Sequence, residues 1–331
     1  MARSGSVEKH SRKDELFFDA DSLRWSTPEV VAEYRAERLK CGVIADLCCG
    51  VGFQSLAFAK KCGVVYAVEI SRKKLDCAEK NAAVLGVKNI VFIHGDVLDK
   101  KIIGKLCCGA FFCDPERPSG ESERTLSSVS PGIKSLVEAY PDIAVEFPPQ
   151  IKSIPFDCEK EYISLNGVLN RLTLYFGKLK RCGVSVVSLP SGERLCAEEG
   201  SVPKTKTAPA RYLYEIDSAV VKAGLVGVLA EKTNTFAVML EKTVFLSSEA
   251  LVESVFFRNS FEVLAACSEG GLVRSLRRLE AGRVVIRFSV APDDYWSIRK
   301  KYERMLSGKK EFFVFKGGVF FIGRKLVNPN L

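Results

Sequence analysis

The sequence predicts an α/β protein built on a doubly wound parallel sheet, and three observations lead to this fold class. Apolar runs typical of buried strands alternate with amphipathic stretches between residues 41 and 147, as in a parallel sheet covered by helices on both faces. A later pair of strand patterns flanks Asn166-Gly167, a dipeptide typical of tight hairpins. Basic residues gather after Gly270. We therefore expect a sheet that ends in an antiparallel hairpin, followed by a small basic α+β domain.

The chain divides into four expected segments. They are an N-terminal helical segment at 1–40, a sheet domain at 41–190, a connector with a helix at 191–260, and a basic α+β domain at 261–331. In the first segment Pro28 fits the first turn of a helix that continues to Leu39. In the connector a helix is expected over 217–232, and the last segment has the pattern β-α-β-α-β-β.

Each strand and helix of the sheet domain has its own signal in the sequence. Strands are expected at 41–47, 64–70, 89–96, 110–114 and 143–147, with helices at 55–62, 71–86, 98–106 and 131–140. The helix over 71–86 ends at Gly86, a residue type that favours the left-handed conformation of a helix C-terminus.

Composition excludes several classes of protein. The chain has 331 residues, of which 47% are apolar and 27% charged, so it is not disordered as a whole. No apolar run reaches the roughly 18 residues of a membrane span, and the polar N-terminus lacks the apolar core of a secretory signal. We expect a cytoplasmic protein. Twelve scattered cysteines without a C-x-x-C pair, and only two histidines, predict reduced thiols, no metal site and no histidine-based triad.

The net positive charge of the chain lies in its C-terminal part. From Gly270 onward fourteen Lys and Arg face five Asp and Glu, which equals the net charge of +9 for the whole sequence. Such a module on a neutral body indicates a polyanionic partner, with nucleic acid first. The alternative is a solvated basic surface without a partner.

A glycine loop, Asp46-Leu-Cys-Cys-Gly50-Val-Gly52, follows the first expected strand. Its glycines let the backbone approach a ligand closely at the start of a helix. A dinucleotide fingerprint would need a third glycine where Ser55 stands. An acid at position 46 would repel a phosphate but suits a ligand with an ammonium group, such as S-adenosylmethionine.

Acids also follow the next three strands, at Glu69, Asp96 and Asp114. The carboxyl ends of parallel strands meet at one edge of the sheet, where open α/β sheets bind ligands. Glu69 can accept ribose hydroxyls, and Asp96 can accept the adenine amino group with Val97 against the ring. The predicted cofactor-binding residues are Asp46, Cys48, Gly50, Gly52, Glu69, Ile70, Asp96, Val97 and Asp114. The alternative is a structural α/β protein with acids at its strand ends.

These motifs together resemble the class I S-adenosylmethionine-dependent methyltransferases, and more narrowly those with a C-terminal THUMP-like domain. The matching segments are TPEVVAEYRAERL, IADLCCGVGFQSLAFA, VYAVEIS, GDVLD, DPERP, RYLYEIDSAVVKAGLVG and FFVFKGGVFFIGRKL. The resemblance implies a Rossmann-like methyltransferase sheet, S-adenosylmethionine as cofactor and an RNA substrate, tRNA or rRNA. Family members usually read D-P-A-R-R where this sequence has Asp114-Pro115-Glu116-Arg117-Pro118.

The fourth strand end decides the chemistry. We predict Asp114, Pro115 and Arg117 as catalytic residues for methylation of a base nitrogen, with Asp114 as hydrogen-bond acceptor and proton sink. Arg117 can contact a phosphate or stack on a base. Cys113 beside them is the one candidate nucleophile for carbon methylation, but it lies in an apolar strand and is better explained as core.

Three residues are candidates for substrate binding: Trp25, Arg35 and Arg117. The Trp25 segment distantly resembles cap-guanine methyltransferases, in which an aromatic residue near this point stacks on the base; a hydrophobic staple at the helix entrance is the alternative. Arg35 can meet a phosphate or lie on a solvated face. Trp296 is expected in the core of the small domain, with Arg299, Lys300 and Lys301 facing outward.

The leading hypothesis is an RNA methyltransferase, whose basic domain docks structured RNA. A methyltransferase of a protein or small molecule is the first alternative. A non-catalytic RNA-binding protein that retains the cofactor pocket is the second. The hairpin and Ser55 disfavour a nicotinamide oxidoreductase. The sequence leaves the oligomeric state open.

Overall fold

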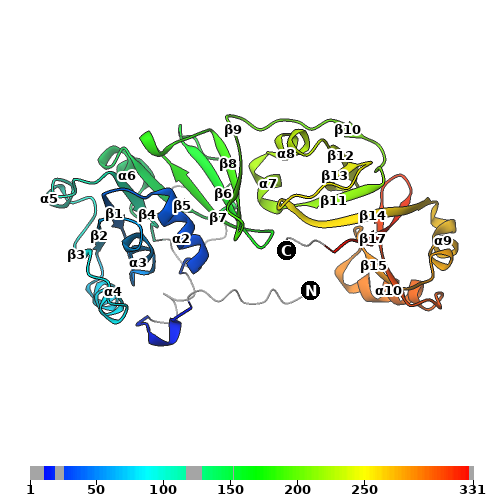
Figure 1. Cartoon of the computed structure of the whole chain (residues 1–331), viewed down its shortest axis with the longest axis horizontal. Helices are drawn as coiled ribbons and strands as arrows, with labels where there is room; N and C mark the ends of the chain where they lie inside the picture. Colours follow the sequence, from blue (N-terminus) through cyan, green and yellow to red (C-terminus); the bar gives the residue numbers. More distant parts are fainter. Residues whose placement is uncertain (1–10, 19–25, 117–128, 152, 328–331) are drawn as a thin grey trace. The chain divides into compact units, whose positions relative to one another are not determined.

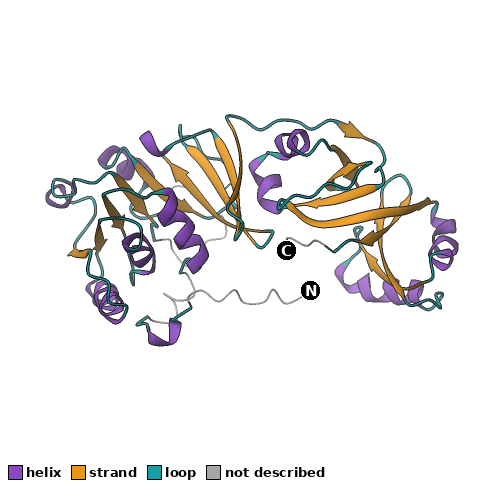
Figure 2. Cartoon of the chain, in the orientation of Figure 1, coloured by secondary structure: helices purple, strands orange, loops and turns teal. Residues whose placement is uncertain are grey.

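The computed structural model describes residues 11–18, 26–116, 129–151 and 153–327. The chain divides into two compact units, each with its own sheet (Figures 1 and 2). Unit 1 comprises residues 1–165 and 169–198, and unit 2 comprises residues 166–168 and 199–331. Within the described part of the chain, no helix is long and apolar enough to cross a membrane.

Unit 1 contains a nine-stranded sheet in the order β3-β2-β1-β4-β5-β7-β6-β8-β9. Its strands are β1 (Val43–Leu47), β2 (Val64–Glu69), β3 (Ile90–His94), β4 (Ala110–Cys113), β5 (Ile143–Phe147), β6 (Glu159–Leu165), β7 (Val168–Tyr175), β8 (Val184–Leu189) and β9 (Glu193–Ala197). The first five strands run parallel, and β7 is antiparallel to β5. The alternating pattern therefore predicted the parallel core of the sheet correctly.

The end of this sheet differs from the expectation. Asn166 and Gly167 lie between β6 and β7 with positive φ angles of 53° and 74°, as a two-residue hairpin turn requires. The sheet continues beyond this turn, because β8 pairs in parallel with β6 and β9 pairs antiparallel with β8. The prediction that the sheet ends in the hairpin is wrong. The apolar run VSVVSL at 184–189 supplies the strand that extends it.

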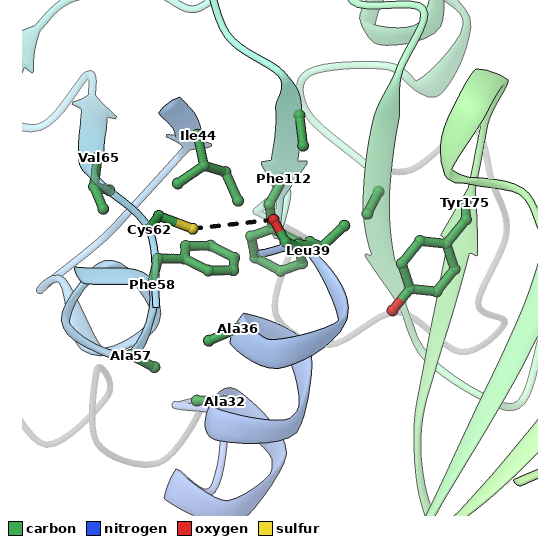
Figure 3. Packing of buried hydrophobic residues seen from close by; sticks show 12 residues of the cluster. Ala32, Ala36, Leu39, Ile44, Ala57, Phe58, Cys62, Val65, Phe112 and Tyr175 are labelled. Atoms are coloured by element: carbon green, nitrogen blue, oxygen red, sulfur yellow. Dashed lines mark hydrogen bonds between the residues drawn. The ribbon is translucent and has the colours of Figure 1, made fainter. Parts of the chain in front are cut away.

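Helices cover both faces of the unit 1 sheet. They are the short η1 (Lys13–Glu15), α2 (Glu29–Arg38), α3 (Phe53–Ala59), α4 (Arg72–Val84), α5 (Lys100–Ile103), α6 (Ile133–Ala139) and the short η3 (Gly177–Leu179). On one face, Ala32 and Ala36 of α2 pack with Phe58 of α3 against Phe112 of β4 (Figure 3). The neighbouring Phe111 packs on Tyr140, which follows α6, with ring centroids 4.7 Å apart. Neighbouring side chains of a strand point to opposite faces, so β4 is buried on both.

Unit 2 contains an eight-stranded sheet in the order β10-β12-β13-β11-β14-β17-β16-β15. Its strands are β10 (Thr205–Lys206), β11 (Tyr212–Ile216), β12 (Phe236–Leu240), β13 (Thr243–Ser248), β14 (Phe257–Cys267), β15 (Ala281–Ile286), β16 (Lys310–Lys316) and β17 (Phe320–Lys325). Its helices are α7 (Ser218–Ala223), α8 (Val226–Lys232), α9 (Leu272–Arg278) and α10 (Tyr295–Glu303), with the short η4 (Glu269–Gly271) and η5 (Pro292–Asp294).

The expected boundary at residue 261 is not a boundary in the structure. The predicted β-α-β-α-β-β order is present as β14, α9, β15, α10, β16 and β17. However, β14 also pairs with β11 over five residues, so the expected connector and the basic module share one sheet. The expected single helix over 217–232 is two helices, because Gly224 adopts a left-handed conformation with φ of 72° between them.

Candidate cofactor site

The glycine loop leaves β1 with three residues in the left-handed region: Cys48, Gly50 and Gly52, with φ of 62°, 59° and 87°. Gly52 directly precedes α3 and packs against α4, because a Cβ placed on it would lie 2.9 Å from the Cβ of Ala78. A Cβ on Gly50 would meet no atom within 4 Å. The two glycines thus differ in role: Gly52 permits close packing of the fold, and Gly50 faces open space.

Glu69, at the end of β2, fixes this loop. Its carboxylate is 5% exposed and accepts a hydrogen bond from the Gly50 N–H at 2.8 Å and another from the Ser71 N–H at 2.8 Å. A carboxylate has about four acceptor positions. Glu69 can therefore hold the loop and still accept hydrogen bonds from a ligand.

Asp46, at the end of β1, faces inward. Its side chain is 1% exposed and accepts a hydrogen bond from the Ser55 hydroxyl. Burial raises the pKa of Asp46 to about 7; the Ser55 hydroxyl and the Arg35 charge act to lower it, and Glu69 acts to raise it. Ser55, whose presence argued against a dinucleotide fingerprint, therefore ties α3 to the end of β1. Asp46 can act on a ligand through its charge beneath the loop.

Arg35 of α2 is buried, and this corrects its expected role. Its side chain is fully inaccessible, so it cannot meet a phosphate of a substrate or lie on a solvated face. It pairs with Glu146 of β5, donates to the Gln54 Oε1 at 2.8 Å, and lies 4.6 Å from the ring centre of Phe112. Burial alone would lower the pKa of Arg35, but Glu146 and other anions raise it, so the guanidinium is charged.

At the end of β3, Asp96 is exposed and Val97 is buried. The Asp96 carboxylate accepts the Leu98 N–H at 2.9 Å, and the carbonyl of Val97 accepts the hydroxyl of Tyr140. Ile70, after β2, is 66% exposed. An acid beside exposed apolar surface can bind a planar heterocycle with a polar edge.

Asp114 and Pro115 follow β4. Asp114 is partly exposed and Pro115 is buried, and the charge of Asp114 acts on Arg35. The Sγ of Cys113 lies 3.8 Å from the Sγ of Cys48, and burial raises the Cys113 pKa well above its usual value. A buried, protonated thiol is a poor nucleophile.

Two predicted residues, Trp25 and Arg117, lie outside the described residues. The structure places the predicted residues that follow β1, β2, β3 and β4 at one sheet edge, since these strands are parallel neighbours. Arg35 lies beneath this edge rather than on it.

Sequence reasoning missed three residues that support the edge. Glu146 pairs with Arg35 and with Arg171 of β7, at 2.6 Å from the Arg171 Nε. Asn81 of α4 donates to the carbonyl of Val51 at 2.9 Å and so anchors the glycine loop. A usable signal was present for Asn81, a polar residue on the apolar face of an amphipathic helix.

Comparison with known proteins agrees with this geometry. A family model described as RNA cap guanine-N2 methyltransferase matches residues 41–150. An uncharacterized S-adenosylmethionine-dependent methyltransferase of Mycobacterium tuberculosis is 28% identical over 222 residues, which cover 64% of this chain and 60% of the relative. Residues 41–150 form a methyltransferase domain of the S-adenosylmethionine-dependent class. The chain spans about 60% of the length of this relative.

Two further proteins are similar to this chain. An uncharacterized RNA methyltransferase of Caldanaerobacter subterraneus is 47% identical over 53 residues, 16% of this chain and 12% of that one. A solved structure from Porphyromonas gingivalis W83, provisionally named a methyltransferase, superposes with a TM-score of 0.74 at 19% identity and covers 94% of this chain and 84% of that one. At this identity the likeness is one of fold alone.

Proposed function

We propose that the chain is an S-adenosylmethionine-dependent RNA methyltransferase that modifies a base nitrogen in tRNA or rRNA. The observation that carries the proposal is the row of acids Glu69, Asp96 and Asp114 at the carboxyl ends of β2, β3 and β4, around the loop held by the Glu69–Gly50 hydrogen bond. The family model and the short match to an RNA methyltransferase support RNA as the substrate.

In this proposal each strand end contacts one part of the cofactor. Glu69 accepts the ribose hydroxyls with the acceptor positions that Gly50 and Ser71 leave open. Asp96 accepts the adenine amino group, with Ile70 and Val97 supplying apolar contact. Gly50 and Cys48 bring the backbone close to the amino-acid part, where the charge of Asp46 favours an ammonium group.

The chemistry requires positioning and a proton acceptor. When bound, S-adenosylmethionine supplies the electrophilic methyl group. Asp114 accepts a hydrogen bond from the target N–H, which orients the nitrogen lone pair, and takes the proton once the nitrogen has gained the methyl group. Pro115 shapes the turn after β4, and Arg117 binds the substrate.

Substitution of the two loop glycines by alanine should separate folding from binding. Gly52→Ala forces a contact of 2.9 Å with Ala78 in a strained conformation, so we expect it to lower the free energy of unfolding by about 2–4 kcal/mol. Gly50→Ala carries only the strain of about 1–2 kcal/mol but fills the space proposed for the cofactor. Urea denaturation and calorimetry of cofactor binding check this. Equal loss of stability in both variants would contradict the assignment.

Cofactor affinity should depend on pH through Asp46. Because the pKa of Asp46 is raised to about 7, its negative charge forms as the pH rises through neutrality. Affinity for the ammonium-bearing cofactor should therefore increase between about pH 6 and pH 8, and Asp46→Asn should remove that part of the increase. The same raised pKa makes the unliganded protein less stable as the pH rises from about 4 to 7. Calorimetric titration with the cofactor at both pH values measures the affinity of the wild type and of Asp46→Asn. If affinity depended on pH in the same way in both proteins, Asp46 would not be the group responsible.

The C-terminal part of unit 2 is proposed as the RNA-docking element. Its fourteen basic against five acidic residues after Gly270 favour a polyanion, and the segment FFVFKGGVFFIGRKL supports a THUMP-like domain within unit 2. A protein or small-molecule substrate would leave this charge unexplained. A non-catalytic RNA-binding role would leave the arrangement of Glu69, Asp96 and Asp114 unexplained.

Methyl transfer from radiolabelled S-adenosylmethionine tests the proposal directly. Unmodified cellular RNA mixed with total protein is the acceptor, and Asp114→Ala is the control. We expect label that RNase removes, protease does not, and the variant lacks. Label that protease removes would show that the substrate is a protein. Label extracted with small molecules would show that the substrate is a small molecule. Either result would contradict RNA as the substrate.

A further inference from the structure

Two neighbouring helices of unit 2 carry exposed basic side chains. Leu272 and Leu276 of α9 and Tyr302 of α10 pack into the same core over β15, β16 and β17. The helices meet near their C-terminal ends, where the Arg277 Nε donates to the carbonyl of Met305 at 2.8 Å. We call the exposed side chains of α9 and α10, with Arg304 after α10, the α9–α10 surface.

Six cations line the α9–α10 surface, and all are exposed. They are Arg274, Arg277, Arg278, Lys300, Lys301 and Arg304. The acid within α10, Glu303, is neutralised by Arg299 at 2.9 Å. Exposed acids also precede each helix, Glu269 before α9 and Asp293 and Asp294 before α10. Glu280 follows α9 and pairs with Lys310 at 2.6 Å, so among the described residues the unpaired acids lie toward the N-terminal ends and the positive charge is strongest toward the C-terminal ends. A hollow of about 470 Å³ that includes Arg277 and Lys309 adjoins this end.

Trp296 lies on α10 and is 58% exposed, so the expectation that it belongs to the core is wrong. Its indole is held in place from two sides. Tyr295 meets it edge-on with centroids 5.3 Å apart, and the guanidinium carbon of Arg299 lies 5.5 Å from the ring centre. Arg299 is fixed by Glu303, which also accepts the Val284 N–H at 3.2 Å. The indole therefore presents an exposed, oriented aromatic surface on the helix that also carries Lys300 and Lys301 and is followed by Arg304.

We propose that the α9–α10 surface binds a single-stranded segment of RNA, with one unpaired base stacked on Trp296 and neighbouring phosphates on Lys300, Lys301 and Arg304. Aromatic stacking combined with cations along a backbone is how proteins hold single strands. A duplex offers the phosphates but keeps its bases stacked internally. The identity of the polyanion rests on the proposed RNA function, which this site deepens.

Trp296 itself provides the readout, because the chain has two tryptophans. In a Trp25→Phe variant of the full chain, all indole fluorescence comes from Trp296. The probes are a single-stranded RNA of twelve nucleotides, the same sequence as a duplex, and inorganic polyphosphate. We expect saturable quenching by the single strand and little quenching by polyphosphate, which carries charge without bases.

Affinity measurements on variants separate stacking from charge. Trp296→Ala should weaken single-strand binding by about tenfold or more while duplex binding stays unchanged. Trp296→Leu, which retains apolar bulk, should behave like Trp296→Ala. Lys300→Ala should weaken the binding of both single-stranded and duplex RNA, and should reduce the salt dependence of the affinity by about one counterion. Lys134→Ala, an exposed lysine of unit 1, is the matched control.

Each outcome decides one proposal. Equal quenching by polyphosphate and single strand, or unchanged affinity in Trp296→Ala, would overturn base stacking at this surface. RNA methylation without quenching would overturn this inference and retain the proposed function. Quenching by the single strand without any RNA methylation by the wild-type protein, which retains Trp25, would support this surface and overturn the proposed substrate.

Discussion

Replacement of Arg35 by methionine should lower the free energy of unfolding by about 3 kcal/mol. Removal of one partner of a buried ion pair leaves the other charge uncompensated, at a cost of about 3–5 kcal/mol. Glu146 is 3% exposed and keeps its second partner, Arg171, which places the effect at the lower end. Methionine retains most of the apolar volume, so the change reports the lost charge. Urea denaturation of the purified protein measures it.

An exposed ion pair provides the matched control. Glu37 pairs with Lys61 at 2.8 Å, and both side chains are more than 40% exposed. Glu37→Ala should change stability by less than about 1 kcal/mol. The double variant Arg35→Met/Glu146→Leu should recover much of the loss, because no unpaired charge remains except Arg171, which can reach solvent. A loss in Arg35→Met no larger than that in Glu37→Ala would show that the buried pair does not support the fold.

Replacement of Asp114 by asparagine should lower kcat by about 10²–10⁴-fold, the usual contribution of a positioned proton acceptor. Asparagine preserves the shape and one hydrogen-bond acceptor but cannot take a proton. Cofactor affinity, measured by calorimetry, should change little, because the Glu69 and Gly50 contacts remain. Steady-state methyl transfer to RNA measures the effect on kcat.

Glu116 gives the control for this position. It lies two residues further along the chain, and its side chain is 76% exposed. Glu116→Gln should retain nearly full activity. If Asp114→Asn kept the wild-type kcat while Glu116→Gln lost activity, Asp114 would not be the proton acceptor and Glu116 would take that role.

The parallel part of the fold was predictable because local signals determine it. The alternation of apolar strands with amphipathic helices specified β1 to β5, and acids at strand ends share an edge in any parallel sheet. The sheet extension was missed because β8 joins the sheet by pairing with β6, and β9 by pairing with β8, and no local pattern encodes the pairing of β8 with β6. The same applies to β14, whose partners lie on both sides of the expected domain boundary.

The burial of charged side chains was the least predictable feature. Arg35 and Glu146 are 111 positions apart, so the sequence gives no sign that they meet, and an arginine in a polar helix suggests an exposed side chain. Arg38 is buried in the same way against Glu159 and Glu161. The expectation for Trp296 was wrong in the opposite direction: an apolar residue type predicts burial, but the side chain is exposed. Partners distant in sequence determine the burial of both arginines.

Calorimetric titration with S-adenosylhomocysteine, the demethylated cofactor product, tests the central claim that the acidic sheet edge holds the cofactor. We expect one binding site per chain, and at least a tenfold loss of affinity in Glu69→Ala, since hydrogen bonds to a carboxylate are worth about 1.5–3 kcal/mol. Glu79→Ala, which removes an exposed acid paired with Arg72 at 3.2 Å, should bind as the wild type does. No binding by the wild type, or equal affinity in Glu69→Ala and the wild type, would contradict the account.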